Sequence, residues 1–388
     1  MIRYLLLPCA AAALGLSAVP HATAQAPVQR AAHHDYRVVT VVEGLVHPWS
    51  IAFLPNGDML ITERPGRLRI VRSGRLLPDP VAGVPAVHAE GQGGLLDVVP
   101  HPDFARNRLL YLSYSKPVGD GSAATTAVVR GRFENDRLTG VQEIFEAVSR
   151  GRGHYGSRLA FDGNGYVFIT VGERQAPARG DLAAHPAQDL SNHHGTVIRL
   201  HEDGRVPADN PFVDSAGARP EIWSYGHRNA QGLAIHPATG DVWITEHGPQ
   251  GGDELNLILP GRNYGWPVIG YGVNYRSGSA IHEGTHREGM EQPVHVWVPS
   301  IATSGLMVYT GNRFPGWRGD LFAGGLAGEV LARLTLDGHT VVNEESLVQR
   351  MGRIRDVRQG PDGYIYLAID HRQGQPTPIL RLEPAGGS

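Results

Sequence analysis

A histidine flanked by glycines is the first residue of this sequence that could do chemistry. His154 lies in GRGHYG at 151–156, where the glycines leave its side chain uncrowded. An imidazole, with an unperturbed pKa of about 6.5, is the usual general base near neutral pH. The sequence contains 19 histidines, however, and a loop histidine is more often simply solvated. Both interpretations stay open from these residues alone.

Two arginine-containing segments could hold carbonyl or carboxylate oxygens. Arg228 and Asn229 are adjacent in YGHRNAQG and supply a fork of donors next to an amide. In the predicted strand RIR, Arg353 and Arg355 would project to one face and could grip carboxylates together. The first pair could equally stabilise a loop, and the second could be alternating charge on an exposed strand.

Two further segments offer polar groups beside bare backbone. The first, EGQGG at 90–94, would bring the Gln92 amide close to a ligand, or it is an ordinary glycine-rich strand entry. The second, EHGPQGGDE at 246–254, is followed by GRNYGWP at 261–267. Its carboxylates and its Gly and Pro carbonyls are hard oxygen ligands of the kind that calcium prefers. It lacks EF-hand spacing, and a surface acidic loop would have the same composition.

Composition excludes several classes of function. Lys and Arg together number 35 against 38 Asp and Glu, so the chain lacks the basic footprint of a nucleic-acid binder. Lys116 is the only lysine of the chain, which removes a Walker-type Gly-Lys loop and argues against a Schiff-base lysine. We therefore expect no nucleic-acid partner.

The first 24 residues have the pattern of a signal peptide. Arg3 precedes an apolar run at 4–16, and Ala-Thr-Ala at 22–24 is a small-x-small cleavage pattern. The apolar run is too short to cross a bilayer, which takes about 20 residues, so we expect no membrane span. The protein is predicted to be periplasmic or secreted. Its only cysteine, Cys9, lies in this segment, so disulfides and thiolate metal sites are excluded from the mature chain.

The elements that must position these segments form a repeat. An alternating strand, a tight turn and a second alternating strand recur six times, and the spacing leaves room for two more strands per unit. This pattern predicts an all-β fold, a six-bladed β-propeller with four-stranded antiparallel blades. A two-sheet sandwich is the competing architecture. The six copies occupy residues 49–62, 94–113, 157–170, 232–245, 305–323 and 353–368.

The repeats cover the mature chain without a linker, so we predict one domain over residues 35–384. Residues 25–34 and the glycines at 386–387 are expected to be unpacked ends. In a propeller, loops at one end of the channel converge, so the polar segments above could share one pocket.

Seven motifs in this order resemble the soluble pyrroloquinoline quinone (PQQ)-dependent sugar dehydrogenases of the glucose/sorbosone dehydrogenase family, particularly the aldose sugar dehydrogenase branch. The resemblance covers nearly the whole mature chain. Its most specific stretches are GQGGLLDVVPHPDF, GHYGSRLAF, GRVPADNPF, SYGHRNAQGLA, EHGPQGGDELN, GRNYGWP and RIRDVRQGPDG.

The resemblance implies a role for each candidate residue. His154 would take the proton from the sugar C1 hydroxyl, and Arg228 would stabilise the developing oxyanion. PQQ would be held by side chains from several loops, namely Gln92, Arg228, Asn229, Tyr275, Arg353 and Arg355. The carbonyls of Gly248 and Pro249 match ligands of a calcium ion that bridges protein and cofactor. Glu254 and Tyr264 match a second, structural calcium site.

The implied reaction is oxidation of an aldose to its lactone, by hydride transfer from C1 to the quinone with calcium as Lewis acid. Electrons would then pass to an external acceptor, a quinone or a cytochrome. A homodimer is left open. Two alternatives also remain: a calcium-dependent hydrolase of the lactonase type, and a non-catalytic exported propeller that binds a ligand.

The sequence departs from the family pattern at two positions. Ala327 stands where the family often has a cofactor-contacting lysine, which puts cofactor affinity in question. Gly153 stands where the larger glucose-specific members have an Asp that helps to bind sugar. The second departure argues for a broader or different substrate pocket.

Overall fold

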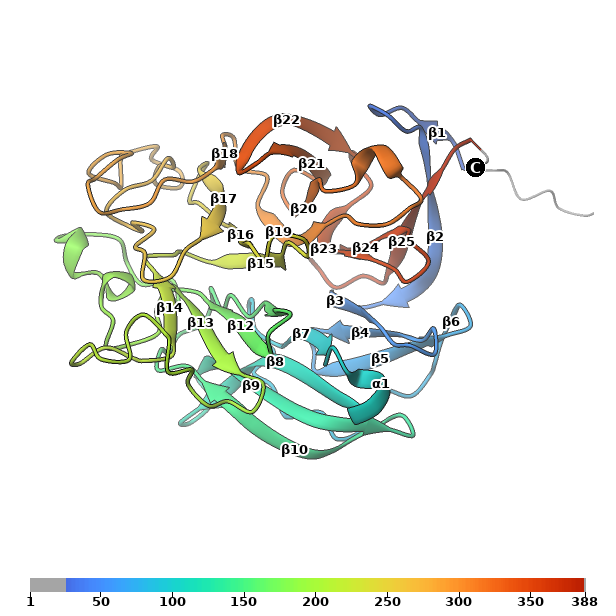
Figure 1. Cartoon of the computed structure of the whole chain (residues 1–388), viewed down its shortest axis with the longest axis horizontal. Coiled ribbons are helices and arrows are strands. Elements are labelled where there is room, and N and C mark those ends of the chain that lie inside the picture. Colours follow the sequence, from blue (N-terminus) through green and yellow to red (C-terminus); the bar gives the residue numbers. More distant parts are fainter. Residues whose placement is uncertain (1–25, 387–388) are drawn as a thin grey trace, which may run out of the picture.

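Six antiparallel sheets surround a central axis (Figure 1). The computed structural model describes residues 26–386, so the signal peptide predicted for residues 1–24 lies outside the described residues. The first strands of neighbouring blades contact one another around the whole ring. The predicted six-bladed propeller is therefore confirmed, and the sandwich is excluded.

Five blades are each built from four strands that follow one another in the sequence, and each predicted hairpin forms the first two strands of its blade. The first three blades are β3 (Pro48–Phe53), β4 (Met59–Glu63), β5 (Arg67–Arg72) and β6 (Arg75–Leu76); β7 (Leu95–Pro100), β8 (Leu109–Val118), β9 (Ala123–Glu134) and β10 (Arg137–Glu146); and β11 (Leu159–Phe161), β12 (Tyr166–Val171), β13 (Thr196–His201) and β14 (Ile222–Tyr225). The next two are β15 (Ala230–Ile235), β16 (Val242–Glu246), β17 (Asp253–Ile258) and β18 (His295–Trp297); and β19 (Thr303–Val308), β20 (Leu321–Gly325), β21 (Val330–Asp337) and β22 (Thr340–Leu347).

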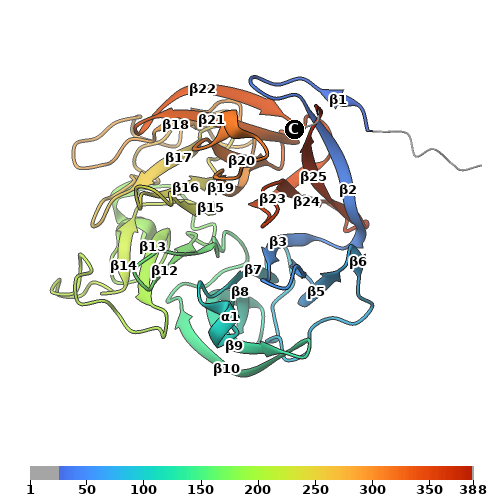
Figure 2. The ribbon, with the colours of Figure 1, turned by 45° about the vertical axis from the view of Figure 1, so that its right-hand side comes forward.

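The sixth blade closes the ring with strands from both ends of the described chain. It contains β23 (Arg353–Gln359), β24 (Ile365–Asp370), β25 (Thr377–Pro384), then β2 (Tyr36–Leu45) and the short β1 (Val28–Gln29). Thr40 lies opposite Leu380, and Figure 2 shows β2 beside β25 at the edge of the ring. This blade therefore has five strands, one more than predicted.

The N-terminal segment expected to be unpacked is packed from residue 28 onward. The Nε1 of Trp317 donates to the carbonyl of Ala32 at 2.8 Å, and the amide of Gly316 donates to Nε2 of His34 at 2.8 Å. The His34 ring also lies edge-on to Trp317, with 5.5 Å between centroids. The expectation of a loose end was wrong here because aromatic side chains of blade five offer it an apolar surface.

Helical structure is confined to single turns in the loops. Their bounds are α1 (Phe104–Asn107) and three 3₁₀ turns, Leu182–Ala184, Pro186–Gln188 and Pro315–Trp317. Within residues 26–386, no helix has the length and apolar character that a membrane crossing takes.

A threonine at the end of the second strand joins each of three blades to the next one. The side chains of Thr62, Thr170 and Thr245 are fully buried. Their hydroxyls donate to carbonyls on the first strand of the following blade, at 2.5, 2.9 and 3.0 Å. The repeated Ile-Thr of the sequence is thus a connection between blades, and it fixes how their loops meet.

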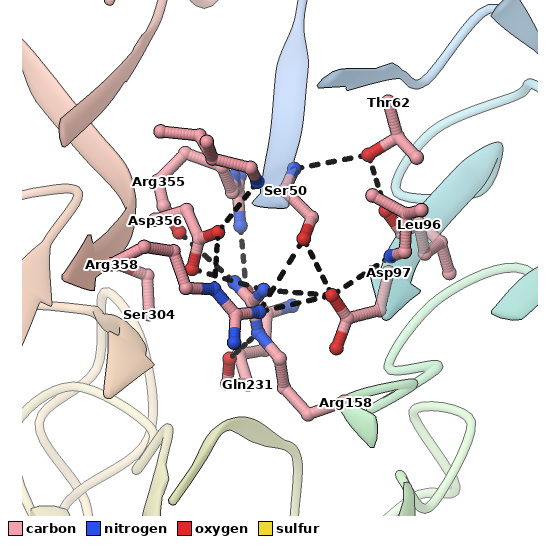
Figure 3. A network of polar contacts seen from close by, with 12 residues as sticks. Ser50, Thr62, Leu96, Asp97, Arg158, Gln231, Ser304, Arg355, Asp356 and Arg358 are labelled. Atoms are coloured by element: carbon pink, nitrogen blue, oxygen red, sulfur yellow. Dashed lines mark hydrogen bonds and ion pairs between the residues drawn. The ribbon is translucent and has the colours of Figure 1, made fainter. Parts of the chain in front are cut away.

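The centre of the ring holds a network of buried ion pairs (Figure 3). Asp97 lies 3.4 Å from Arg158 and 3.0 Å from Arg358. Asp356 lies 3.0 Å from Arg158 and 2.9 Å from Arg358. Arg158 also donates to the carbonyl of Arg355 at 3.3 Å. Because each charge has partners of opposite sign, the network ties three blades together beneath the loops that carry the candidate site.

Candidate active site

Direct hydrogen bonds bring three of the predicted segments together at one end of the channel. The backbone amide of His154 donates to Oε1 of Gln92 at 2.8 Å. The amide of Gly156 donates to Oδ1 of Asn229 at 3.1 Å. The segments come from loops that lead into β7, β11 and β15. Residues that are far apart in the sequence therefore share one site, as the propeller geometry predicts.

His154 is paired with a buried carboxylate. Its Nδ1 lies 2.6 Å from Oε2 of Glu173, which follows β12, and both side chains are almost completely buried. The amide of Glu173 in turn donates to the carbonyl of Arg228 at 2.9 Å. A carboxylate beside Nδ1 favours the tautomer with its proton on that nitrogen, which leaves Nε2 free to accept a proton.

The surroundings keep His154 neutral and Glu173 ionised. Burial lowers the pKa of His154, with Arg228 and Arg174 acting in the same direction and Glu173 opposing them. Burial alone would raise the pKa of Glu173, but the adjacent His154 and Arg228 bring it below its usual range. An uncharged imidazole at neutral pH is the form that a general base requires.

The backbone at His154 is held in an unfavourable conformation by its neighbours. Its φ is +45°, a region that side-chain-bearing residues rarely adopt. Arg174 donates to its carbonyl at 2.6 Å. A Cβ on Gly172 would lie only 2.2 Å from that same oxygen, so the close approach depends on glycine at this position. Such strain, fixed by surrounding contacts, is typical of functional sites.

Arg228 is anchored by the loop that follows β16. Its backbone amide donates to Oε2 of Glu246 at 2.6 Å, and Nη1 donates to the carbonyls of His247 and Gly248 at 3.1 and 2.7 Å. Its guanidinium carbon lies 5.1 Å from the centroid of the Trp266 ring. The arginine is thus oriented with respect to both His154 and the predicted metal-binding carbonyls.

Arg353 and Arg355 both lie close to Asp370, which pairs with Arg355 and is the cross-strand neighbour of Arg353. Arg355 donates to Oε1 of Gln231 at 2.6 Å and lies 3.4 Å from Oδ2 of Asp370. Arg353 is the cross-strand partner of Asp370 and donates to the carbonyl of Leu326 at 3.1 Å. A bulge after Ile354 interrupts the regular alternation of β23, and of the two arginines only Arg355 contacts the Asp370 carboxylate directly.

The residues present fit a polyanionic quinone. Among residues 26–386, the buried Nε atoms of Arg228, Arg353 and Arg355 have no hydrogen-bond partner, and neither does Nε2 of His247. PQQ carries three carboxylates and adjacent quinone carbonyls, which are the acceptors that these donors lack. Ala327, at the position of the family lysine, contributes only a backbone bond from its amide to the carbonyl of Ile301 at 2.9 Å.

The loop after β16 also fits a cation. Glu246 and Glu254 border a cavity of about 20 Å³, and Nδ2 of Asn256 donates to both carboxylates at 3.0 Å. Burial and the charge of Glu246 raise the pKa of Glu254 to about 8. Gly248 and Pro249 line the same cavity, so carbonyl and carboxylate oxygens are available to calcium there.

Metal binding here would depend on backbone oxygens as well as on side chains. Within the described part of the chain, no three side chains of the His, Cys, Asp and Glu types converge on one point. The hydroxyl of Tyr264 donates to the carbonyl of Leu257 at 2.5 Å and accepts from the amide of Leu259 at 2.9 Å. Its contribution to a calcium site is therefore limited to its carbonyl.

Tyr275 has an exposed side chain, although its loop adjoins the predicted metal-binding segment, where the amide of Arg276 donates to Oε1 of Gln250 at 3.2 Å. Tyr275 belongs to the long loop between β17 and β18, and its side chain is 61% exposed. The structure gives it no hydrogen bond to another predicted site residue within 26–386. Its contact with PQQ remains a prediction.

Sequence reasoning named Glu246 only as part of the acidic segment 246–254, and it missed Glu173, the partner of His154. Glu63 and Glu246 directly follow the repeated Ile-Thr, and Glu173 follows it after two residues; all three side chains are at most 3% exposed. Aligning the repeats with one another would have revealed this recurrent acid. His247 was given no role of its own within the segment 246–254, and Asp370 was missed because nothing in its local sequence distinguishes it.

Comparison with known proteins identifies the family. The family model described as "Glucose / Sorbosone dehydrogenase" matches residues 45–381, most of the chain. The chain belongs to the glucose/sorbosone dehydrogenase family. The resemblance inferred from the seven motifs is therefore confirmed, and the protein is a member of a family of oxidoreductases.

Relatives within the glucose/sorbosone dehydrogenase family extend over nearly the whole chain. The aldose sugar dehydrogenase YliI of Escherichia coli is 45% identical over 364 residues, which are 91% of this chain and 94% of that protein. The apo crystal structure of the soluble aldose sugar dehydrogenase from Escherichia coli has a TM-score of 0.82 at 43% identity, covering 90% of this chain and 99% of the other. A PQQ-bound aldose sugar dehydrogenase from Streptomyces coelicolor has a TM-score of 0.72 at 28% identity, covering 90% and 98%.

Proposed function

We propose that this protein oxidises aldoses at the C1 hydroxyl to lactones, with PQQ and calcium, and passes the electrons to an external quinone or cytochrome. We further propose that it acts in the periplasm or outside the cell. The observation that carries the proposal is the His154–Glu173 pair, held beside Arg228 in a pocket whose buried guanidinium nitrogens lack partners. The PQQ-bound relative supports the choice of cofactor.

His154 acts as the general base in this proposal. Its Nδ1 donates to Glu173, so Nε2 accepts the proton of the C1 hydroxyl as the C1–H bond breaks. Glu173 stabilises the imidazolium that forms, at a distance of 2.6 Å. Because both groups are buried before substrate arrives, little reorganisation accompanies proton transfer.

Arg228 and the loop after β16 supply positive charge and oxygen ligands. When bound, PQQ would supply a hydride-accepting carbonyl, and calcium would supply Lewis acidity. Gly248 and Pro249 would hold the metal through their carbonyls, and Glu254 would hold the second calcium with the carbonyl of Tyr264. Arg228, fixed by Gly248 and Glu246, stabilises the negative charge that develops on the oxygen.

The substrate is an aldose, without a narrow preference for glucose. Gly153 has no side chain with which to hold a sugar hydroxyl next to His154. A Cβ at Gly153 would lie 2.7 Å from the side chain of Gln175, so this flank of the base is bounded by an amide. An amide there is compatible with several arrangements of sugar hydroxyls.

Reduction of an electron-accepting dye by the purified protein tests the proposal. A panel of aldoses is compared before and after addition of PQQ and calcium, with a chelator as control. We expect activity only when both are added, and loss of it with the chelator. Cofactor binding without turnover on any aldose would favour a non-catalytic propeller, and lactone hydrolysis without PQQ would favour the hydrolase.

A further inference from the structure

A third arginine, which the proposed roles leave unused, lies beside Arg353 and Arg355. Arg64 follows β4, and its Nη1 donates to the carbonyl of Gly91, next to Gln92, at 2.6 Å. Its Nη2 lies 2.9 Å from Nδ1 of His47. Nδ1 of His47 lies 2.8 Å from Oδ1 of Asp370. His47 thus links Arg64 to Asp370, the carboxylate that Arg355 also contacts.

The backbone of Arg64 is fixed by the neighbouring blade. The amide of Leu95 donates to its carbonyl at 3.1 Å. A Cβ on Gly94 would lie 2.1 Å from that carbonyl oxygen, so the two chains approach as closely as a glycine permits. The side chain is therefore presented from a rigid base, which is what a binding residue requires.

The charges around Asp370 do not balance. Arg64, Arg353 and Arg355 contribute three positive charges against one carboxylate, and Glu329 and Arg372, the other charged groups near Arg353, cancel each other. Burial lowers the pKa of Arg64, and burial with the neighbouring arginines lowers that of Arg355 to about 10. Two positive charges in a partly buried site call for an anion.

Unused donors point in the same direction. The Nε atoms of Arg64, Arg353 and Arg355 are all buried, and none has a hydrogen-bond partner in the described chain. A guanidinium has five N–H donors in a planar fork, and the two bonds of Arg64 leave its Nε edge available to a carboxylate.

We propose that Arg64 completes a carboxylate-binding subsite with Arg353 and Arg355, and so supplies the positive charge that Ala327 does not. The ligand class is a planar aromatic polycarboxylate. The proposal rests on the proposed function, in which that polycarboxylate is PQQ. Arg64 binds and positions the cofactor, and it takes no part in proton transfer.

The proposal is tested by titrating the calcium-loaded apoprotein with PQQ and measuring binding by tryptophan fluorescence or calorimetry. We expect Arg64→Gln to weaken binding about 10- to 100-fold, the range for a lost hydrogen bond to a charged group. Arg64→Lys should recover part of the affinity because it restores the charge without the fork. Arg75→Gln, which removes an exposed arginine of the same blade, is the matched control and should bind as wild type.

Melting temperatures without ligand separate binding from folding. A ligand-binding arginine set among like charges should be replaced with little loss of stability, whereas a structural arginine should not. Binding by Arg64→Gln within twofold of wild type would overturn the proposal. So would a fall in melting temperature for both Arg64 variants that matches their loss of affinity.

Benzene-1,3,5-tricarboxylate, which has no redox chemistry, distinguishes this proposal from the proposed function. Binding of this probe that depends on Arg64, in a protein that does not bind PQQ, would support the anion subsite and contradict the cofactor assignment. Failure of the wild-type protein to bind either compound would overturn both.

Discussion

The imidazole of His154 has the partners of a general base. Glu173 fixes its tautomer, Gln92 and Arg174 fix its backbone, and burial keeps it neutral. Each contact comes from a different part of the chain, so the residue's chemistry is a property of the assembled site. That is why GRGHYG alone left a solvated loop histidine open.

Replacing the base should separate turnover from binding. We expect His154→Gln to lower kcat by a factor on the order of 10² to 10⁴, the usual contribution of a general base. Because the arginines that would hold PQQ are untouched, the Kd of PQQ should stay within a few-fold of wild type. Stopped-flow kinetics alongside PQQ titration measure both. Weakened binding with an unchanged rate per bound cofactor would show that His154 does not act as the base.

The pH dependence of kcat/KM follows from the lowered pKa of His154. The neutral form is the active one, so the rate should stay constant from pH 8 down past 6.5 and fall only at more acidic pH. Three charged groups face the imidazole: Glu173 raises its pKa, and Arg174 and Arg228 lower it. An acid limb centred at or above pH 6.5 would contradict this assignment.

Removing the Glu173 carboxylate should move the acid limb of the pH profile of kcat/KM. We expect Glu173→Gln to shift it to still lower pH, because a group that raises the pKa of His154 is lost. The same change should lower kcat on the order of 10²-fold or more, because the tautomer is no longer fixed. The matched pH profiles of the two proteins provide the measurement. A limb that stays in place would mean that the pair is not coupled.

The strands of the six blades could mostly be predicted from the sequence, but the pairing that closes the ring could not. Each repeat carries its own strand pattern and turn, so six local hairpins were visible in the sequence. Pairing of β2 with β25 joins Leu45 to Thr377, and no local pattern reports a contact between residues so distant. The packing of Ala32 and His34 on blade five was missed for the same reason.

Truncation of the N-terminal strands tests the closure. A chain that begins at residue 46 lacks β1 and β2. It therefore exposes the edge of β25 and the apolar cluster against which Tyr36 packs. We expect it to unfold at a much lower temperature, or with lost cooperativity, in thermal unfolding followed by circular dichroism. A chain that begins at residue 35 keeps β2 and serves as control, with a smaller loss. Equal melting temperatures for the two would mean that β2 does not close the ring.

For the molecule as a whole, the charges are arranged in two layers along the axis. The lower network pairs Asp97 and Asp356 with Arg158 and Arg358, so it is internally balanced. The upper layer leaves arginines near Asp370 in excess and two carboxylates, Glu246 and Glu254, next to each other. Such an imbalance of charge is expected of a site that binds both an anion and a cation. The seven sequence motifs contain most of the residues of this site.

Calcium should stabilise the whole protein through the acidic part of this layer. At a calcium concentration 100 times Kd, binding to the folded state contributes about 2.7 kcal/mol, so the melting temperature should rise by several degrees. We expect Glu254→Gln to lose the part of this rise that the second calcium contributes. Without calcium it should melt no lower than wild type, because burial and Glu246 raise the pKa of Glu254 to about 8 and Gln resembles the protonated acid. Differential scanning calorimetry with calcium and with chelator makes the comparison. An undiminished calcium effect in the variant would place the ion elsewhere.

In the proposed reaction, one aldose is oxidised at C1 for each PQQ held in this site. The most direct measurement mixes anaerobic protein, loaded with PQQ and calcium, with excess aldose and no electron acceptor, and counts the lactone formed. We expect one lactone per loaded protein, formed rapidly by wild type and far more slowly by His154→Gln. A protein that holds PQQ yet forms no lactone from any aldose would not be an aldose dehydrogenase, and lactone formed equally fast by His154→Gln would show that His154 is not the base.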